Sequence, residues 1–310
     1  MLRYKVIANP LAGNGAGERA IPQVERILSG YGLDFDVVRT ERPWHAADLA
    51  QEAIAAGYDA VVALGGDGTS NEVLNGLMRA KTFIPDPSSY EREGRKMCAM
   101  GVLCVGTGND FAYGMGIPLD LEEGCRALAR GRTRWIDVGR VAGMRYFGNG
   151  IGIGFDAVVS LQARRLTRVR GFLRYFLAVL RTLLFYYHAP LTTIQADEQT
   201  IVQPTLMTSV MNGRRMGGGF LMAPEATPDD GFFDFCIAAK MNRLQMLSFV
   251  PRFIRGTQVG KKRITMGRAR RVVVTCEESG LVAHADGETL CLDAHRLELE
   301  LLPRQIEVIC

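Results

Sequence analysis

The sequence predicts an α/β N-terminal domain with a parallel sheet, followed by a C-terminal, mainly antiparallel β-sandwich domain. The length of 310 residues fits two domains. Short apolar runs alternate with amphipathic stretches up to about residue 130, and strand-like runs with Gly-rich turns follow. The hydrophobic content of 47% and the mean hydropathy of +0.04 are enough to bury sizeable cores, which excludes wholesale disorder.

The N-terminal half repeats a strand, a loop and a helix four times, which predicts parallel strands with helices on both faces. We expect strands over 4–8, 35–39, 60–64 and 100–105, and helices over 21–29, 46–56, 71–79 and 121–129. The polar segment 85–94, which contains two prolines, is expected to be a surface insertion.

The C-terminal half is predicted to be mostly strands. We expect them over 135–141, 145–149, 192–195, 206–211, 232–238, 272–275 and 297–302, interrupted by helical stretches over 157–188 and 242–255. The domains are predicted as 1–133 and 134–310 with a cleft between them, and the C-terminal segment either stays in the second domain or returns to the first.

Composition narrows the classes of partner and compartment. There are 37 basic and 33 acidic residues, so the net charge of +4 does not indicate a nucleic-acid partner. The seven cysteines are scattered without a CxxC pair, which favours neither a disulfide framework nor a zinc site. No run of about 18 uncharged apolar residues occurs, so we expect a cytoplasmic protein whose membrane contact, if any, is peripheral, at the inner face.

Three glycine-rich loops follow predicted parallel strands. The motif GGDGTSNE, residues 65–72, comes between a buried-type strand and a helix, so backbone N–H groups and the hydroxyl of Thr69 could cradle a phosphate. The alternative is a plain tight turn; the motif matches neither a P-loop nor a dinucleotide fingerprint. Loops 9–17 and 106–110 follow two further strands. Because ligands of open α/β sheets bind at the carboxyl ends of the strands, the three loops predict one nucleotide-sized site.

These motifs resemble a known family. NPLAGNG (9–15), GGDGTSNE (65–72), GTGNDFA (106–112) and DGE (286–288) are similar, in order and spacing, to the diacylglycerol kinase catalytic-domain family, which includes bacterial soluble lipid kinases and the sphingosine and ceramide kinases. The resemblance covers nearly the whole chain. It implies an α/β nucleotide domain and a β-sandwich, with ATP and lipid meeting in the cleft.

The resemblance implies a set of nucleotide-binding residues. These are Asn9, Thr40, Gly66, Asp67, Gly68, Thr69, Ser70, Asn71, Glu72 and Thr107. Arg19, after the first loop, either pairs with phosphate or is a solvated helix residue. Residues 41–46 depart from the small-residue turn of many relatives, which leaves the contacts on the adenine side open.

Two groups of carboxylates are candidates for chemistry. The turn 223–232 carries oxygen ligands that suit a hard cation, with a hairpin turn as the alternative. The resemblance implies Mg²⁺ there, held by Asp230 and the backbone carbonyls of Thr227 and Phe232. It also implies Glu288 as the general base and Asp67 as metal or network support, although the two roles could be reversed.

Two further segments have alternative interpretations. Residues 160–190 combine six arginines with many aromatic and apolar residues, which is typical either of a helix at a membrane interface or of a core helix with solvated arginines. The motif GIGIGFD, residues 150–156, superficially matches a dinucleotide fingerprint but lies in the wrong half, so we expect close strand packing.

We expect an ATP- and Mg²⁺-dependent lipid kinase that phosphorylates a hydroxyl of a diacylglycerol-like or sphingoid lipid at the membrane surface. The alternatives are an NAD kinase-like enzyme, whose family shares the Gly-Gly-Asp-Gly turn, and a non-catalytic nucleotide- or lipid-binding regulator. The oligomeric state is open between a monomer and a homodimer.

Overall fold

The computed structural model describes residues 2–83, 98–166, 169 and 171–310. The predicted insertion at 85–94 lies outside the described residues. The chain divides into two compact units, one comprising Met1–Ile136 and Arg304–Cys310 and the other Asp137–Pro303. The last seven residues therefore group with the N-terminal unit.

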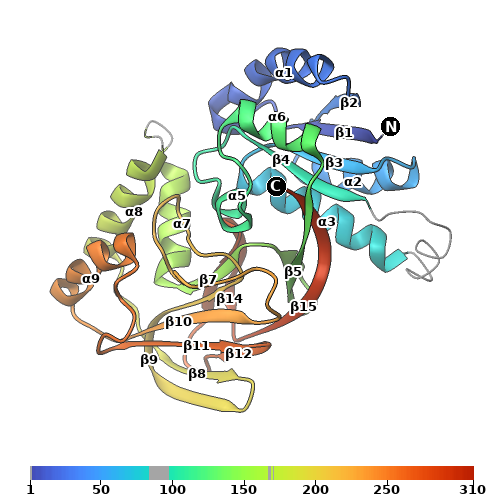
Figure 1. Ribbon diagram of the computed structural model, residues 1–310. Helices are drawn as coiled ribbons and strands as arrows, with labels where there is room; N and C mark the ends of the chain where they lie inside the picture. The colour runs from blue at the N-terminus through green and yellow to red at the C-terminus, as the bar shows by residue number, and fades with distance from the viewer. Residues whose placement is uncertain (1, 84–97, 167–168, 170) are drawn as a thin grey trace. The chain divides into compact units, whose positions relative to one another are not determined.

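The N-terminal unit contains a parallel sheet. Its strands are β1 (Arg3–Ala8), β2 (Asp34–Arg39), β3 (Ala60–Gly65) and β4 (Ala99–Cys104), in the order β2-β1-β3-β4 (Figure 1). The end of β15 (Arg296–Ile309) pairs in parallel with β4 through Val308 and Met100. All residues of β3 and β4 are buried, which explains their continuous apolar sequences.

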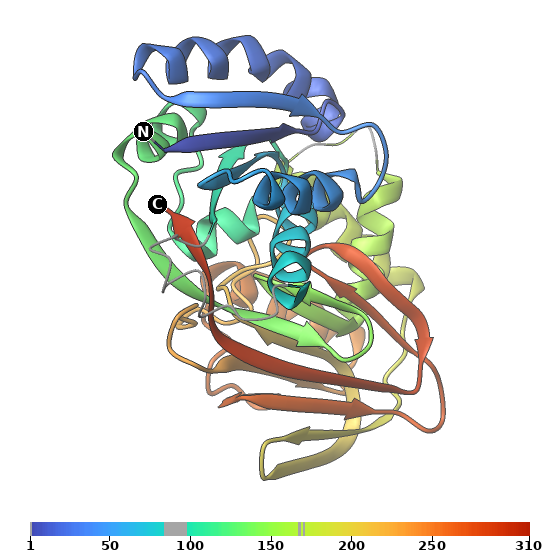
Figure 2. The same cartoon turned by 90° about the vertical axis from the view of Figure 1, so that its right-hand side faces the viewer.

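Helices cover both faces of this sheet. On one face, α1 (Ala12–Gly30) and α6 (Leu121–Arg130) share a core with β1, β3 and β4, which includes Val6, Val24, Leu64, Leu103 and Leu128. On the other face lie α2 (His45–Ala55) and α3 (Asp67–Phe83), which pack closely because Gly76 leaves room for the carbonyl of Ala47 (Figure 2). A short helix, α5 (Asp110–Met115), follows the loop after β4.

The C-terminal unit is built from antiparallel strands. They are β6 (Arg145–Phe147), β7 (Gly150–Gly154), β8 (Leu191–Ala196), β9 (Gln199–Met211), β10 (Phe233–Ala239), β11 (Ile264–Ala269), β12 (Arg271–Thr275), β13 (Leu281–Ala285) and β14 (Glu288–Ala294), with most of β5 (Thr133–Val141) and the first part of β15. The first part of β9 pairs with β8 and its last part with β7 and β10. This change of partner lets two layers enclose a core that includes Phe147, Phe235, Val272 and Leu299.

Three helices form a second core in this unit. The helices α7 (Phe155–Arg165), α8 (Gly171–Phe185) and α9 (Arg243–Arg255) pack with residues of β9 and β10, as Val159, Leu183, Met207 and Val250 illustrate (Figure 1). Asn242 and Gln245 form a reciprocal capping box that fixes where α9 begins.

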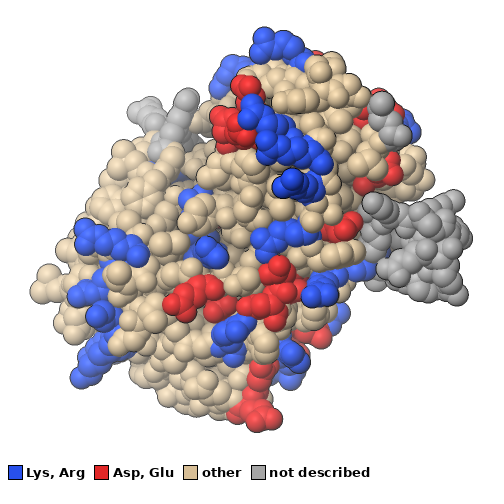
Figure 3. Space-filling model, viewed as in Figure 1, with Lys and Arg blue, Asp and Glu red and all other residues tan. Residues whose placement is uncertain are grey.

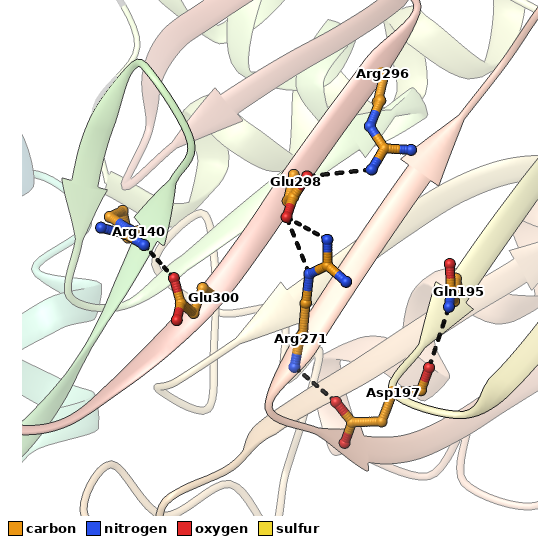
Figure 4. Close-up of polar contacts among 7 residues, drawn as sticks. All are labelled: Arg140, Gln195, Asp197, Arg271, Arg296, Glu298 and Glu300. Carbon is orange, nitrogen blue, oxygen red and sulfur yellow. Dashed lines mark hydrogen bonds and ion pairs between the residues drawn. The ribbon is translucent and has the colours of Figure 1, made fainter.

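Charged side chains line strands β12 and β15. Arg271 and Arg296 pair with Glu298, Arg140 pairs with Glu300, and the Arg271 N–H donates to Asp197 Oδ1 at 2.8 Å (Figure 4). These ion pairs are exposed, so each contributes little to stability, about 0–1 kcal/mol. They favour the observed pairing register of these strands, but they stabilise the chain too little to explain why it folds.

The predicted fold class, an α/β unit followed by an antiparallel β-sandwich, is confirmed. The stretch predicted as one helical region, 157–188, contains two helices, and α9 lies where the second region was predicted. The segment 150–156 forms β7 and the start of α7. Among the described residues, no helix is long and apolar enough to cross a membrane.

Candidate active site

The loops after β1 and β3 are joined by side chains. Asn9 Nδ2 donates to Thr69 Oγ1 at 3.1 Å, and Asn9 Oδ1 accepts from the Leu11 N–H at 3.1 Å. The strand order reverses between β1 and β3, so this contact lies at the switch point where α/β sheets bind ligands. Because Thr69 Oγ1 accepts from Asn9, its own hydroxyl proton remains able to donate.

The motif 65–72 places the start of α3 directly behind β3. The missing side chain of Gly65 is required, since a Cβ there would lie 2.3 Å from Thr69 Oγ1. Thr69, Ser70 and Asn71 are buried in the first turns of the helix. The amides of the first turn have no acceptor within the helix, which makes this end suited to a phosphate.

The loop after β4 packs on the same turn through its backbone. A Cβ on Gly106 would lie 2.4 Å from Gly66 Cα, and one on Gly66 would lie 3.0 Å from Gly106 Cα. The missing side chain of Gly66 therefore lets the two loops touch, and it also leaves room for a phosphate to approach. Thr107, the next residue, is half-buried in this loop.

Two carboxylates and an amide oxygen gather around residues 106–110. A Cβ on Gly108 would lie 2.8 Å from Asp67 Oδ2 and 3.3 Å from Asp110 Oδ2. Asp67 Oδ1 accepts from the Phe111 N–H at 3.0 Å, and buried Asn109 Oδ1 has no hydrogen-bond partner among the described residues. Two carboxylates and an amide oxygen are metal ligands of the type that Mg²⁺ prefers. This position therefore fits a cation that is bound together with a nucleotide.

Other predicted nucleotide-binding residues have structural partners in the N-terminal unit. The Thr40 N–H donates to the Ala8 carbonyl at 2.9 Å, which holds Thr40 beside the end of β1. Glu72 Oε2 accepts from the Ala46 N–H at 3.2 Å in the first turn of α2. Arg19 bends over the first glycine loop and donates to the Asn14 carbonyl at 3.4 Å. The contact of Glu72 gives its carboxylate the role of a helix cap.

In the C-terminal unit, the hairpin turn between β13 and β14 is held by Asp286. Asp286 and Gly287 both have positive φ, 49° and 81°, as a two-residue hairpin turn of the primed type requires. The Asp286 carboxylate accepts three backbone N–H groups of residues 148–150, at 2.8, 3.0 and 2.9 Å. These bonds fix the turn against the segment before β7.

Glu288, the predicted base, follows this turn and is fixed by residues of α7. Arg164 forms an ion pair with the Glu288 carboxylate and donates to the Gly287 carbonyl at 2.9 Å. Ser160 Oγ donates to the same carbonyl at 3.1 Å. No sequence pattern predicted these contacts, in which Arg164 of α7 pairs with the residues of the turn.

A buried acid and a buried imidazole lie behind the turn. The Gly287 N–H donates to His284 Nδ1 at 3.2 Å, which assigns the ring proton of neutral His284 to Nε2. A Cβ on Gly152 would lie 2.5 Å from both His284 Nε2 and Asp156 Oδ2, so these atoms are neighbours across that glycine. Ser209 Oγ donates to Asp156 Oδ2 at 2.7 Å.

Burial shifts both groups toward their neutral forms. It raises the pKa of Asp156 to about 7, against the hydrogen bond from Ser209, and it lowers the pKa of His284 to about 4, with a smaller contribution from Arg164. At pH 7 His284 is therefore neutral and able to accept the Gly287 N–H. Neither residue was assigned a role from the sequence, although Asp156 is the last residue of the motif 150–156 and His284 lies two residues before the motif 286–288.

The predicted metal site around Asp230 has a different arrangement. Arg268 forms an ion pair with the Asp230 carboxylate, whose other oxygen accepts from the Phe232 N–H at 3.0 Å. The carboxylate is thus already neutralised by a guanidinium group, so the residues as arranged do not fit a metal ion. Within the described residues, no three His, Cys, Asp or Glu side chains form a metal cluster. The carbonyls of Thr227 and Phe232 remain predicted ligands only.

The structure thus combines a parallel sheet, with phosphate-type loops at its carboxyl edge, and an antiparallel β-sandwich. Residues 3–141 match the family model "Diacylglycerol kinase catalytic domain", and residues 149–310 match "YegS C-terminal NAD kinase beta sandwich-like domain". The chain belongs to the diacylglycerol kinase family of lipid kinases, enzymes that phosphorylate an alcohol acceptor. The predicted family and enzyme class are confirmed.

Relatives and solved structures match almost the whole chain. A diacylglycerol kinase of Mycobacterium tuberculosis is 30% identical over 99% of this chain and 94% of its own length, and one of Bacillus subtilis is 29% identical over 93% and 90%. A diacylglycerol kinase structure from Bacillus anthracis has a TM-score of 0.71 at 20% identity, covering 99% of this chain and 96% of its own. An NAD kinase from Archaeoglobus fulgidus in complex with ATP has a TM-score of 0.51 at 13% identity, with 100% and 94% covered. The two structures support the fold alone.

Proposed function

We propose that this protein transfers the γ-phosphate of ATP, with Mg²⁺, to a hydroxyl of a diacylglycerol-like or sphingoid lipid. The observation that carries the proposal is the junction of three glycine loops at the switch point of the parallel sheet. Asn9, Thr69 and the first turn of α3 there offer hydrogen-bond donors. The same proposal assigns the enzyme to the cytoplasm, at the membrane face that its acceptor occupies.

The N-terminal unit supplies the groups that hold the nucleotide. Asp67 and Asp110 would hold the magnesium ion, which when bound neutralises negative charge on the phosphates. The amides of the first turn of α3 and the hydroxyl of Thr69 would orient the γ-phosphate. The close contact of Gly66 and Gly106 keeps the two loops in register for this task.

The C-terminal unit supplies the proposed base. The acceptor oxygen bonds to the γ-phosphorus as the bond from phosphorus to the β–γ bridging oxygen breaks, and the proton of the hydroxyl passes to Glu288. A base must be held at a defined position, and the bonds of Asp286, Ser160 and Arg164 hold this turn. Asp67 is the alternative base.

The test is a transfer assay with γ-labelled ATP and Mg²⁺ on a panel of acceptors: diacylglycerol, ceramide, sphingosine, phosphatidylglycerol and NAD. We expect label in a diacylglycerol or sphingoid lipid. Label in NAD alone would establish the NAD kinase-like alternative. Binding of ATP without transfer to any acceptor would leave the non-catalytic alternative.

A further inference from the structure

Helices α8 and α9 are apolar on their exposed faces as well as on their buried faces. The buried faces, which include Ala178, Leu183, Met246 and Val250, belong to the second core of the C-terminal unit. On the exposed faces, Phe185 and Leu244 have 81% and 79% of their surface accessible, while Leu184 and Leu247 have 66% and 50%. Packing within the chain explains the buried apolar side chains but not the exposed ones. A cluster of large exposed apolar side chains indicates an interaction site.

The exposed side chains form one stripe along each helix. In α8, positions 173, 177, 181 and 184 are exposed at helical spacing, and in α9 positions 244, 247, 251 and 255 are. Each stripe combines leucines with a single arginine, Arg181 in α8 and Arg255 in α9. A long basic side chain among leucines can extend its charge toward lipid headgroups while its stem stays in apolar surroundings.

The two stripes meet where α9 begins. Arg243 Nε donates to the Leu183 carbonyl at 3.0 Å, and its guanidinium lies 5.5 Å from the centre of the Tyr187 ring. This contact brings the first turn of α9 beside the last turn of α8. Leu184, Phe185, Leu244 and Leu247, which we call the apolar tip, are thus presented from neighbouring turns.

The two chain segments that carry the apolar tip are basic. Residues 157–196 contain six arginines and residues 235–276 contain ten lysines and arginines, and neither segment contains an aspartate or a glutamate, whereas the whole chain has a net charge of only +4. Figure 3 shows basic side chains over α9 and no acidic side chain there. An apolar surface carried by basic segments is complementary to an anionic bilayer.

We propose that the exposed faces of α8 and α9 form a docking surface for an anionic membrane, with the apolar tip inserted among the headgroups. The proposal extends the sequence-based interpretation of 160–190 to α9 and moves the contact away from Arg164. It rests on the proposed function only in supplying a reason for membrane contact. Vesicle binding can be measured without ATP or acceptor.

The test is flotation of the full chain with vesicles of phosphatidylcholine alone or mixed with phosphatidylglycerol, at about 50 mM salt, where surface charges are weakly screened. We expect binding to the anionic vesicles and much weaker binding to the neutral ones. The variant Leu184→Gln/Phe185→Gln/Leu244→Gln/Leu247→Gln should bind at least about 100-fold more weakly, because four apolar side chains no longer leave water. The variant Arg181→Glu/Arg255→Glu should lose about fivefold or more in vesicle affinity for each arginine replaced, and this loss should occur on anionic vesicles only.

The matched control is Val202→Gln/Leu292→Gln, which removes apolar side chains with 59% and 60% exposure elsewhere in the same unit. It should bind like the wild type, with circular dichroism reporting the fold of every variant. Equal vesicle binding by the apolar-tip variant and the wild type would overturn the proposal. So would retention on an acidic polymer such as heparin without vesicle binding, which would indicate an acidic macromolecular partner.

A second readout separates this proposal from the proposed function. With a short-chain acceptor dispersed as monomers, the apolar-tip variant should keep wild-type turnover, since it is altered only in docking. Loss of turnover on the dispersed acceptor would overturn a docking role. Absence of turnover in the wild type would count against the proposed function and leave the vesicle result standing.

Discussion

Thr69 is the residue at which the loops of the N-terminal unit meet. Its oxygen accepts from Asn9 Nδ2, which turns its hydroxyl proton toward another acceptor. We expect Thr69→Val to weaken ATP binding about 10- to 100-fold, because a hydrogen bond to a charged phosphate is lost while the volume is kept. Calorimetric titration with ATP measures this. Thr205→Val, a buried threonine of the C-terminal unit, is the control, and equal affinities for both variants would contradict the assignment.

Asp156 and His284 give the folded chain two opposing pH dependences. Between about pH 4 and 7 the folded chain keeps a proton on Asp156 that the unfolded chain has released, so this group makes stability fall as pH rises. Between about pH 4 and 6.5 the unfolded chain binds a proton on His284 that the folded chain lacks, so this group makes stability rise with pH. In the wild type the two contributions largely cancel.

Replacing either Asp156 or His284 should reveal the pH dependence of stability that the other contributes. With His284→Gln, the melting temperature relative to wild type should fall as pH is raised from about 4 to 6.5, because the contribution of His284, which rises with pH over that range, is lost. With Asp156→Asn it should rise from about pH 4 to 7, because the contribution of Asp156, which falls as pH rises, is lost. By the size of the pKa shifts, the effect on the free energy of unfolding is at most about 4 kcal/mol for Asp156 and about 3 kcal/mol for His284. If the melting temperature of each variant differed from that of the wild type by the same amount at every pH, neither group would be perturbed by burial.

At the scale of elements, the contact of two backbone loops sets the geometry of the phosphate site. Gly106→Ala places a Cβ 2.4 Å from Gly66 Cα, so the loops must separate. We expect at least about a tenfold loss of ATP affinity and a destabilisation of about 1–3 kcal/mol. Gly30→Ala is the control, because nothing lies within 4 Å of its Cβ, and it should be neutral or slightly stabilising. Identical ATP affinity of the two variants would count against a role for the loop contact.

The elements of the N-terminal unit were predictable because their signals are local. The apolar run of β3 followed by GGDGT indicates a buried strand and a phosphate-type turn, and the structure has both. The strand β11 was not predicted, and β7 was expected only as close strand packing, because its alternating glycines lower its strand propensity. The helix α5 has only six residues and no periodicity to detect.

Contacts between distant residues account for what sequence reasoning missed in the candidate site. His284 and Asp156 become neighbours only because β13 pairs with β7. The ion pair of Asp230 with Arg268 joins a residue just before β10 to a residue of β11, strands that pair although α9 lies between them in the chain, and the turn 223–232 carries no signal of it. The cap that Glu72 provides to α2 likewise depends on the packing of α2 on α3. Residue type and spacing predicted which loops meet at the edge of the sheet, but not the partners of these side chains.

At the scale of the whole molecule, the nucleotide loops and the proposed base belong to different units of the chain. Glu288→Gln should therefore lower kcat about 10²–10⁴-fold and leave ATP affinity almost unchanged. Steady-state kinetics on a lipid acceptor together with ATP titration measure both quantities. Near wild-type kcat in Glu288→Gln, with Asp67→Asn inactive while ATP is still bound, would assign the base to Asp67.

The central claim is that ATP held at the loops of the N-terminal unit donates its γ-phosphate to a lipid hydroxyl. The most direct measurement is transfer of labelled γ-phosphate to a lipid acceptor by the wild type and by Asp67→Asn. Asp67 lies beside Asp110 and holds the start of α5, so its carboxylate should affect both nucleotide binding and turnover. We expect labelled lipid with the wild type, and with Asp67→Asn a loss of transfer of at least about 100-fold together with weaker ATP binding. Unchanged transfer and unchanged ATP affinity in Asp67→Asn would contradict it.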